Sequence, residues 1–288
     1  MPISKLSPKA VAIPHGSDPM IFEPLRKLFR PTAAKAAPSR VPAGERYYVV
    51  GDIHGRLDLF NALIAAIEAD DAAAGVAETT VVLLGDLVDR GPESAGVLYR
   101  AREWQAQRRV RILIGNHEEM FLECFQDKEV LRHFLKHGGR ETILSFGIPP
   151  QDYNQLTVDD LFERLPDLVP VDIREYVSSF EEMIVAGDYA FVHAGIDPRA
   201  ALEEQKRSDL LWIRDRFLRY EGPLDKVIVH GHTIFDEVTD HGGRIAIDTG
   251  AFRSGKLSAL VLEDEVRRTI MAAKADGRIE IFNGEICA

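Results

Sequence analysis

Short apolar runs recur along the chain, and each run stops at a glycine or at a polar side chain. They are rich in β-branched residues and cover residues 47–50, 80–84, 110–114, 190–192, 227–229 and 245–247. Runs of this kind predict buried strands. Apolar residues at helical spacing follow the first two runs, at Phe60, Leu63, Ile64 and Ile67 and then at Val97, Leu98, Ala101 and Trp104. The alternation predicts a layered α/β sheet whose polar strand ends meet in a crevice at the carboxyl edge.

The chain divides into a proline-rich beginning and one folded domain. Eight of the fifteen prolines precede residue 45, and the stretch 31–38 reads as a linker. We therefore expect a basic tail over residues 1–44 and a single domain over residues 45–288. Residues 118–186 should form a helical insertion that walls the crevice, because glycine and proline pairs break this segment and it lacks such strand ends.

An amphipathic segment lies inside the tail. Its apolar residues fall at helical spacing, at Met20, Ile21, Phe22, Leu25, Leu28 and Phe29. Docking on the chain's own domain or on a second subunit is the favoured interpretation, because few such short segments bind membranes alone. The alternative is a weak contact of residues 20–30 with a membrane surface or a partner.

The charge is unevenly distributed. The chain of 288 residues has a formal charge of −11, and the first 45 residues carry seven Lys/Arg against three Asp/Glu. The remaining acidic body should repel nucleic acid.

No run of 18 apolar residues and no signal-peptide pattern occurs, so we expect a cytoplasmic protein. Two cysteines, Cys124 and Cys287, suit a reducing compartment.

Candidate chemistry starts at the first strand end, in the sequence Gly51-Asp52-Ile53-His54-Gly55. Positions two apart on an extended segment point the same way, so the Asp52 carboxylate and the His54 imidazole can approach one cation. Taken alone, this spacing occurs more often in loop hydrogen bonds than in metal sites.

Four further elements strengthen the interpretation. The second strand leads into the sequence GDLVDRG, which contains Asp86, Asp89 and Arg90, and the third leads into GNHE, with Asn116 and His117. Arginine's planar guanidinium matches phosphate oxygens in two places at once. Two later strands lead directly into His193 and into the sequence His230-Gly231-His232. Five polar elements at five strand ends indicate a built site.

The series GDIHG, GDLVDRG, GNHE, VHAGI and GHT resembles the phosphoprotein phosphatase family of metallophosphoesterases, and most of all its bacterial and phage serine/threonine phosphatases. The resemblance covers roughly residues 46–262. It implies a four-layer α/β fold, a β-sandwich flanked by helices with the active site at the carboxyl ends of strands. It also implies a catalytic domain in which a metal-bridging hydroxide attacks phosphoserine or phosphothreonine, with phosphotyrosine as a further candidate substrate.

The resemblance implies two metal ions. Its ligand set, carried over to this chain, is Asp52 and His54 for the first ion, Asp86 as the bridge, and Asn116, His193 and His232 for the second. Oxygen and nitrogen ligands without a thiolate favour manganese, iron or zinc over copper. Manganese is the expected metal, with iron or zinc as alternatives.

The resemblance also assigns the groups that handle the proton and the phosphate. His117 would be the general acid, oriented and kept protonated by Asp89, and Arg90 would bind the phosphate. A second phosphate-binding arginine is expected between the last two histidine motifs. Arg214 is the candidate for that role, and Arg216 competes with it.

Several alternatives stay open. The sequence His-Ala-Gly-Ile at residue 193 also occurs in symmetrical dinucleoside tetraphosphatases, so such an enzyme or another nucleotide phosphohydrolase is the alternative function. Those enzymes typically lack the counterpart of Asp89 and read GNHD. His230 is an alternative ligand or a support for one. A metal-binding scaffold has no use for Asp89, Arg90 and His117, and is disfavoured.

Overall fold

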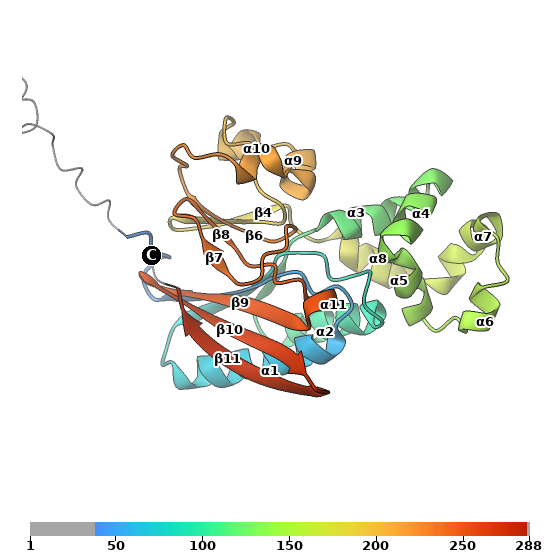
Figure 1. Ribbon diagram of the computed structural model, residues 1–288, viewed down its shortest axis with the longest axis horizontal. Helices are drawn as coiled ribbons and strands as arrows, with labels where there is room; N and C mark the ends of the chain where they lie inside the picture. Colours follow the sequence, from blue (N-terminus) through green and yellow to red (C-terminus); the bar gives the residue numbers. More distant parts are fainter. Residues whose placement is uncertain (1–37, 287–288) are drawn as a thin grey trace, which may run out of the picture. The chain divides into compact units, whose positions relative to one another are not determined.

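Two β-sheets lie face to face in the structure, a computed structural model in which residues 38–286 are described (Figure 1). Among these residues, six strands form the first sheet, in the order β11 (Arg278–Glu285), β10 (Val266–Ala275), β9 (Lys256–Glu263), β1 (Glu45–Val50), β2 (Glu78–Leu83) and β3 (Val110–Ile112). The second sheet has the order β4 (Met183–Ala186), β5 (Tyr189–Val192), β6 (Val227–His230), β8 (Arg244–Ala246) and β7 (Thr239–Asp240). Strands β1, β2 and β3 run parallel, as do β5, β6 and β8.

Strand β1 shows how one apolar run serves two layers. Its side chains alternate between the two faces of the sheet. Tyr47 and Val49 belong to the core between the sheets, where they join Phe191 of β5. Tyr48 and Val50 belong to the core on the opposite face, under the helices. Both faces are buried, so the run is continuously apolar.

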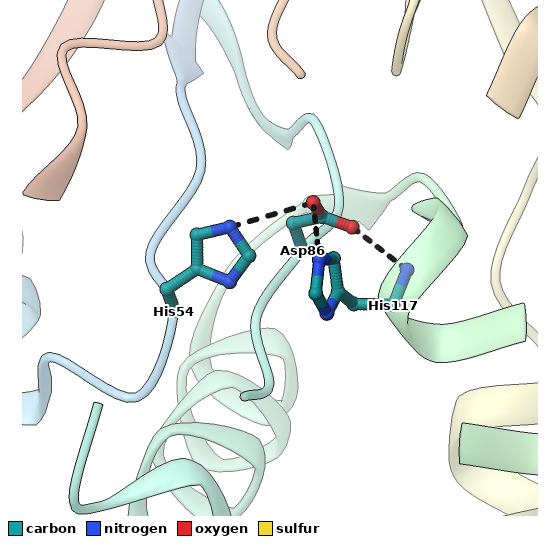
Figure 2. A group of neighbouring side chains, drawn as sticks. All are labelled: His54, Asp86 and His117. Carbon is teal, nitrogen blue, oxygen red and sulfur yellow. Dashed lines mark hydrogen bonds and ion pairs between the residues drawn. The ribbon is translucent and has the colours of Figure 1, made fainter. Parts of the chain in front are cut away.

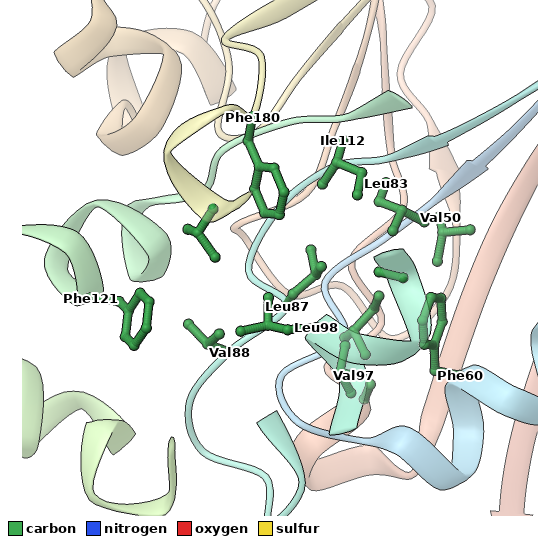
Figure 3. Packing of buried hydrophobic residues seen from close by; sticks show 14 of the residues in the cluster. Val50, Phe60, Leu83, Leu87, Val88, Val97, Leu98, Ile112, Phe121 and Phe180 are labelled. Atoms are coloured by element: carbon green, nitrogen blue, oxygen red, sulfur yellow. The ribbon is translucent and has the colours of Figure 1, made fainter. Parts of the chain in front are cut away.

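Helices cover the outer face of each sheet. They are α1 (Leu57–Ala73) and α2 (Ser94–Gln107) on the first sheet, and α9 (Arg207–Trp212) and α10 (Asp215–Leu218) on the second. Figure 3 shows Phe60, Val97 and Leu98 from the first pair packed against Val50 and Leu83 of the strands. The order of layers is therefore helix, sheet, sheet, helix. The four-layer fold implied by the resemblance is confirmed.

Between β3 and β4 the chain is helical. This segment contains α3 (Asn116–Glu123), α4 (Lys128–Phe134), the π-helical turn η1 (Leu135–Gly139), α5 (Arg140–Ser145), α6 (Pro150–Tyr153), α7 (Val158–Leu168) and α8 (Val171–Ser178). Two short helices lie elsewhere, η2 (Leu202–Glu204) and α11 (Ala251–Ser254). No helix within residues 38–286 is both long and apolar enough to cross a bilayer.

The structure corrects three details of the sequence interpretation. Alternation of strands and helices predicted one layered sheet, but β1 and β5 belong to different sheets, and strands β9 to β11 were not predicted. Residues 39–44, assigned to the tail, pack on the domain: Val41 is buried between the sheets and donates its N–H to the Asp264 carbonyl at 3.2 Å. The predicted insertion over 118–186 ends in strand β4 rather than in a helix. The amphipathic segment 20–30 lies outside the described residues.

A buried arginine ties β1 to the rest of the first sheet and its helix. Arg46 is 1% exposed and makes paired hydrogen bonds to Glu263, of 2.9 Å from Nε and 2.7 Å from Nη2. Its Nη1 donates to Asp71 at 2.7 Å, and its Nη2 donates to the Ala74 carbonyl at 3.0 Å. These groups stand near the C-terminal end of α1, where a positive charge is favourable. Arg46 therefore joins β1, β9 and α1 at one point.

Replacing Arg46 by alanine is expected to lower the free energy of unfolding by about 3 kcal/mol, because Asp71, Glu263 and a helix-end carbonyl lose their shared partner. Urea unfolding followed by circular dichroism measures the change. Arg109→Ala is the matched control: this arginine pairs with Glu78 at the surface, and its loss should cost less than about 1 kcal/mol. Equal losses for the two variants would contradict the role of Arg46.

Candidate metal centre

Strand ends from both sheets bring polar side chains together. The first sheet supplies Asp52, His54, Asp86, Asn116 and His117, and the second supplies His193 and His232. Each of them has a relative exposure of 9% or less. The carboxyl ends of parallel strands lie at one edge of a sheet, and here the edges of two stacked sheets meet.

One group of possible ligands joins His54, Asp86 and His117 (Figure 2). The Oδ2 atom of Asp86 lies 3.5 Å from Nε2 of His54 and 3.9 Å from Nε2 of His117. The backbone N–H of His117 donates to Oδ1 of Asp86 at 3.0 Å. This group was predicted in part, since His117 was assigned as an acid rather than as a ligand.

A second group joins Asp86, His193 and His232. Oδ1 of Asp86 lies 3.4 Å from Nε2 of His193. The Asn116 side-chain oxygen lies 3.0 Å from that same nitrogen and 2.7 Å from Nδ1 of His232. Because Asp86 belongs to both groups through different oxygens, its carboxylate stands where a bridging ligand would.

Backbone carbonyls fix how two of the imidazoles point. Nδ1 of His54 lies 2.8 Å from the Val88 carbonyl, and Nδ1 of His193 lies 2.9 Å from the Leu84 carbonyl. A carbonyl oxygen accepts, so each Nδ1 carries the proton and each Nε2 presents a lone pair. Both carbonyls flank Asp86, so a single loop presents the shared carboxylate and orients a histidine on either side of it.

Burial sets the protonation of these rings. It lowers the pKa of His54 and of His193, and it lowers the pKa of His232 to about 2. The three imidazoles are therefore neutral near neutral pH and keep lone pairs for a metal. Burial alone would raise the pKa of Asp86, but the positive charge that the surrounding imidazoles carry at the low pH where this carboxyl titrates outweighs burial and lowers that pKa. The Asp86 carboxylate is thus ionised at the centre of the site.

Asp52 occupies a neighbouring position. Among the described residues it belongs to neither of the two ligand groups. Its carboxylate accepts the backbone N–H of His232 at 3.0 Å. Burial, followed by the charges of Asp248 and Asp86, raises the pKa of Asp52 well above its ordinary value. Like charges are therefore crowded beside the two groups, and a cation would relieve that repulsion.

A buried glutamate holds the loop that carries Asp86. Glu118 is fully buried, and its carboxylate accepts the backbone N–H groups of Gly115 at 2.9 Å, Asp86 at 2.7 Å, Leu87 at 2.7 Å and Val88 at 3.2 Å. Burial, with the charge of Asp86 next, raises the pKa of Glu118 to about 7, although the amide bonds act to lower it. Glu118 thus fixes the second and third motifs relative to one another.

The backbone of the site is strained. Five of its non-glycine residues have positive φ angles: His54 (47°), Asp86 (50°), Asp89 (73°), Arg90 (69°) and His232 (62°). Left-handed conformations of such residues persist when surrounding contacts enforce them, and they cluster at functional sites. Close packing contributes, since a Cβ atom on Gly115 would lie 2.2 Å from Oδ1 of Asp86.

His117 also contacts Asp89 and Arg90. Its Nδ1 lies 2.6 Å from Oδ2 of Asp89, and its Nε2 lies 2.7 Å from Nη2 of Arg90. Burial acts to lower the pKa of His117, but the carboxylates of Asp86 and Asp89 outweigh it and raise that pKa. The guanidinium of Arg90 also lies 2.7 Å from Nε2 of His54 and stacks on Phe252 at 4.8 Å. Imidazole and guanidinium therefore face the same space beside Asp86.

The two candidate arginines lie in different surroundings. The positive charge of Arg214 acts on His232 and contributes to its lowered pKa. Arg216 instead pairs with Asp197, at 3.3 Å, and with Asp209. This placement favours Arg214 as the second phosphate-binding residue, and that role stays a prediction.

His230 points away from the ligands. It is fully buried, and its ring meets Phe217 edge to face under the helices of the second sheet, with the ring centroids 5.1 Å apart. The side-chain alternation that suggested a shared direction with His232 fails here, because the strand ends at His230 and His232 has a left-handed backbone. His230 packs as a core residue.

Four side chains of the site were not predicted from the sequence. Asp248 and Phe252 follow β8, Thr142 lies in the helical insertion, and Glu118 follows His117. Glu118 had a local signal, because a glutamate at the third position of a helix commonly accepts the backbone N–H of the N-cap residue, here Gly115. Asp248 also stood at a predicted strand end. Thr142 and Phe252 had no signal, since their contacts are remote in sequence.

The donor set fits metal ions. With its proton directed to the Leu84 carbonyl, His193 presents an Nε2 lone pair to the Asn116 oxygen at 3.0 Å. Two acceptors that face each other repel unless a cation lies among them. Carboxylate, amide and imidazole donors suit manganese, iron or zinc. The two groups offer His54, Asp86, His117, His193 and His232 to such ions, with the Asn116 oxygen beside the second group, whereas Asp52 as a ligand stays a prediction.

A helix-flanked β-sandwich with clustered aspartate and histidine at its strand ends defines a metallophosphoesterase. Residues 45–261 match the family model for calcineurin-like phosphoesterases, and the chain belongs to this family. The resemblance drawn from the motifs is confirmed. The protein is therefore a metal-dependent hydrolase of phosphate esters or anhydrides, and members of the family use pairs of divalent metal ions.

Named relatives differ in substrate. The chain is 29% identical to serine/threonine-protein phosphatase 2 of Escherichia coli (strain K12) over 223 residues, which cover 73% of this chain and 90% of the relative. It is 42% identical over 78 residues to a symmetrical bis(5'-nucleosyl)-tetraphosphatase of Yersinia pestis (strain Pestoides F), which is 27% of this chain and 25% of the relative. The crystal structure of a cold-active protein-tyrosine phosphatase of a psychrophile, Shewanella SP., shares the fold, with a TM-score of 0.51, 20% identity and coverage of 84% and 83%.

Asp86→Asn is expected to abolish binding of both metal ions, because the bridging position loses its charge while its shape is kept. Elemental analysis after dialysis against manganese should find two ions per chain in the native protein and none in the variant. The native melting temperature should also rise with manganese, by an amount equivalent to about 2.7 kcal/mol at a hundredfold excess over Kd, whereas that of the variant should not.

His137→Asn is the control for this experiment. His137 is exposed on the turn η1, and its Nδ1 contacts the His133 carbonyl at 2.8 Å. The control variant should keep two ions. Two ions per chain in Asp86→Asn would rule out the bridging role of Asp86.

Proposed function

We propose that the protein is a phosphatase that hydrolyses phosphoserine and phosphothreonine in proteins, with phosphotyrosine as a further substrate. The observation that carries the proposal is the contact of 2.6 Å between Asp89 and Nδ1 of His117, beside a carboxylate shared by two ligand groups. The match to an Escherichia coli serine/threonine-protein phosphatase over 90% of its length supports it.

Asp89 and His117 matter because of the leaving group. When a phosphoserine ester breaks, the departing alkoxide is a strong base and needs a proton as the P–O bond breaks. An imidazolium at His117 can donate that proton from Nε2, while Asp89 holds Nδ1–H and favours the charged ring. A nucleotide anhydride releases a far weaker base and gains little from such an acid. The pair therefore favours an ester substrate.

The other residues bind and orient the phosphate. Two divalent ions, when bound, would supply an activated water and positive charge for the phosphoryl oxygens. Arg90 presents its guanidinium beside His54 and His117, and the charge of Arg214 acts on His232 of the other ligand group. A phosphate placed between these arginines would have charge stabilisation from two sides as negative charge develops in the transition state. We propose manganese as the metal, with iron or zinc as alternatives.

A symmetrical dinucleoside tetraphosphatase is the second candidate function. It is favoured by the 42% identity over 78 residues to such an enzyme, although that match covers only a quarter of the relative.

An activity panel with manganese decides between the two candidate functions. Phosphoserine and phosphothreonine peptides should give a higher kcat/KM than diadenosine tetraphosphate, and phosphotyrosine peptides complete the panel. A preference for the dinucleotide would overturn the proposed substrate.

His117→Asn is expected to lower kcat for a phosphoserine peptide by about 10²- to 10⁴-fold, the usual contribution of a general acid, and to leave two metal ions per chain. Steady-state kinetics and elemental analysis on the same preparation measure both quantities. Unchanged turnover would refute the acid role. Loss of an ion would instead identify His117 as a ligand, which its place in a ligand group with His54 and Asp86 allows.

A further inference from the structure

The helical insertion reaches the site through one buried hydroxyl. Thr142, on α5, is fully buried, and its Oγ1 donates to Oδ1 of Asp89 at 2.6 Å. The same oxygen accepts the backbone N–H of Asp89 at 2.9 Å. Ser94 accepts that N–H as well, at 3.0 Å, and lies 3.0 Å from the Thr142 hydroxyl. A residue 53 positions away thus contacts both the backbone and the side chain of Asp89.

These contacts hold a strained segment. Asp89 and Arg90 are consecutive, and both have left-handed backbones, with φ of 73° and 69°. Outside glycine such a conformation needs support from its surroundings. Besides the Asp89 contacts, the Arg90 N–H donates to the Gly138 carbonyl at 3.1 Å. Two of the three supporting groups, Thr142 and Gly138, come from the insertion, and the third, Ser94, begins α2.

The Thr142 bond also sets the direction of the Asp89 carboxylate. One of its oxygens contacts Thr142 and the other contacts Nδ1 of His117, at 2.6 Å in each case. With both oxygens held, the carboxylate cannot rotate about its χ2 angle, and the His117 ring keeps its Nε2 beside Arg90. Only a side chain that both donates and accepts can bind the carboxylate and the amide of the same residue.

We propose that Thr142 is a positioning residue for the acid step: it fixes Asp89, which in turn fixes His117 for proton donation to the leaving group. The inference rests on the proposed function. It names a residue that affects kcat for substrates whose leaving group needs a proton. In the step concerned, a water oxygen bonds to phosphorus and loses its proton to solvent, while the P–O bond to the leaving group breaks. The electron pair of the broken bond goes to the leaving oxygen, which takes the proton from Nε2 of His117.

The test compares two substrates that differ in their need for an acid. Thr142→Val keeps the shape of the side chain and removes the hydroxyl. We expect kcat for a phosphoserine peptide to fall by roughly tenfold, a part of what a general acid contributes. For p-nitrophenyl phosphate, whose leaving group needs no proton, kcat should change less than about twofold, and KM should stay near the native value for both substrates. Thr142→Ser, which keeps the hydroxyl, should restore phosphopeptide turnover.

Thr157→Val is the matched control. Thr157 lies in the same insertion, where its hydroxyl accepts the Asp160 N–H at the start of α7. Loss of this cap should lower the melting temperature without changing the ratio of the two activities. If Thr142→Val does not fold, the comparison uses Thr142→Ala and Thr142→Ser, which differ only in the hydroxyl.

The possible outcomes separate this inference from the proposed function. An equal loss on both substrates, no loss on either, or failure of the serine variant to restore turnover would each overturn the role of Thr142. Native protein that does not hydrolyse the phosphopeptide at all would instead overturn the proposed function. Metal content is measured in every variant, and loss of an ion from Thr142→Val would also count against a role confined to the acid step.

Discussion

The burial of the Asp86 carboxylate is the constraint on which the rest of the site depends. An isolated charge in the interior is costly, and it persists only when surrounding groups compensate it. Here the His117 amide donates to one of its oxygens, and His54 and His193 approach the two oxygens with Nε2 lone pairs, so that a cation held among these groups would supply the remaining compensation. Because His193 belongs to the second sheet, the centre forms only when the two sheets stack. The metal centre therefore requires the folded sandwich.

Strain is the second consequence of placing this carboxylate at a strand end. An extended strand points successive side chains to opposite faces, whereas a metal pair needs several side chains to converge. Left-handed residues after β1, β2 and β6 solve this problem, and each needs an anchor. Glu118 anchors the loop around Asp86, and Thr142 with Gly138 anchors Asp89 and Arg90. The insertion thus supplies groups that hold the backbone of the site in place.

The sequence predicted what repeats locally and missed what depends on distant contacts. Motifs at strand ends identified Asp86, His54, His193 and Asn116, because a polar residue after a buried strand leaves a clear pattern. The pattern could not assign those strands to two sheets, since a strand is equally apolar whether a helix or a second sheet covers it. Nor could it find Thr142, whose partner lies 53 residues away. For Asp52 the local pattern was clear, because it stands two residues before His54. Its carboxylate nevertheless lies against Asp248 and the His232 amide rather than in either ligand group.

The proposal of an ester rather than an anhydride substrate rests on the pairing of Asp89 with His117. A catalyst for anhydrides needs charge stabilisation, which the arginines and a metal pair would already supply. The Asp89 carboxylate, buried beside His117 and held by a hydroxyl from another part of the chain, adds nothing to that task. Its burial is offset by the bonds to His117 and Thr142, and the arrangement aids catalysis when the ring it orients transfers a proton. A site for anhydrides could replace Asp89 by a neutral residue without loss, so its presence here is the physical reason to favour a phosphoester with a basic leaving group.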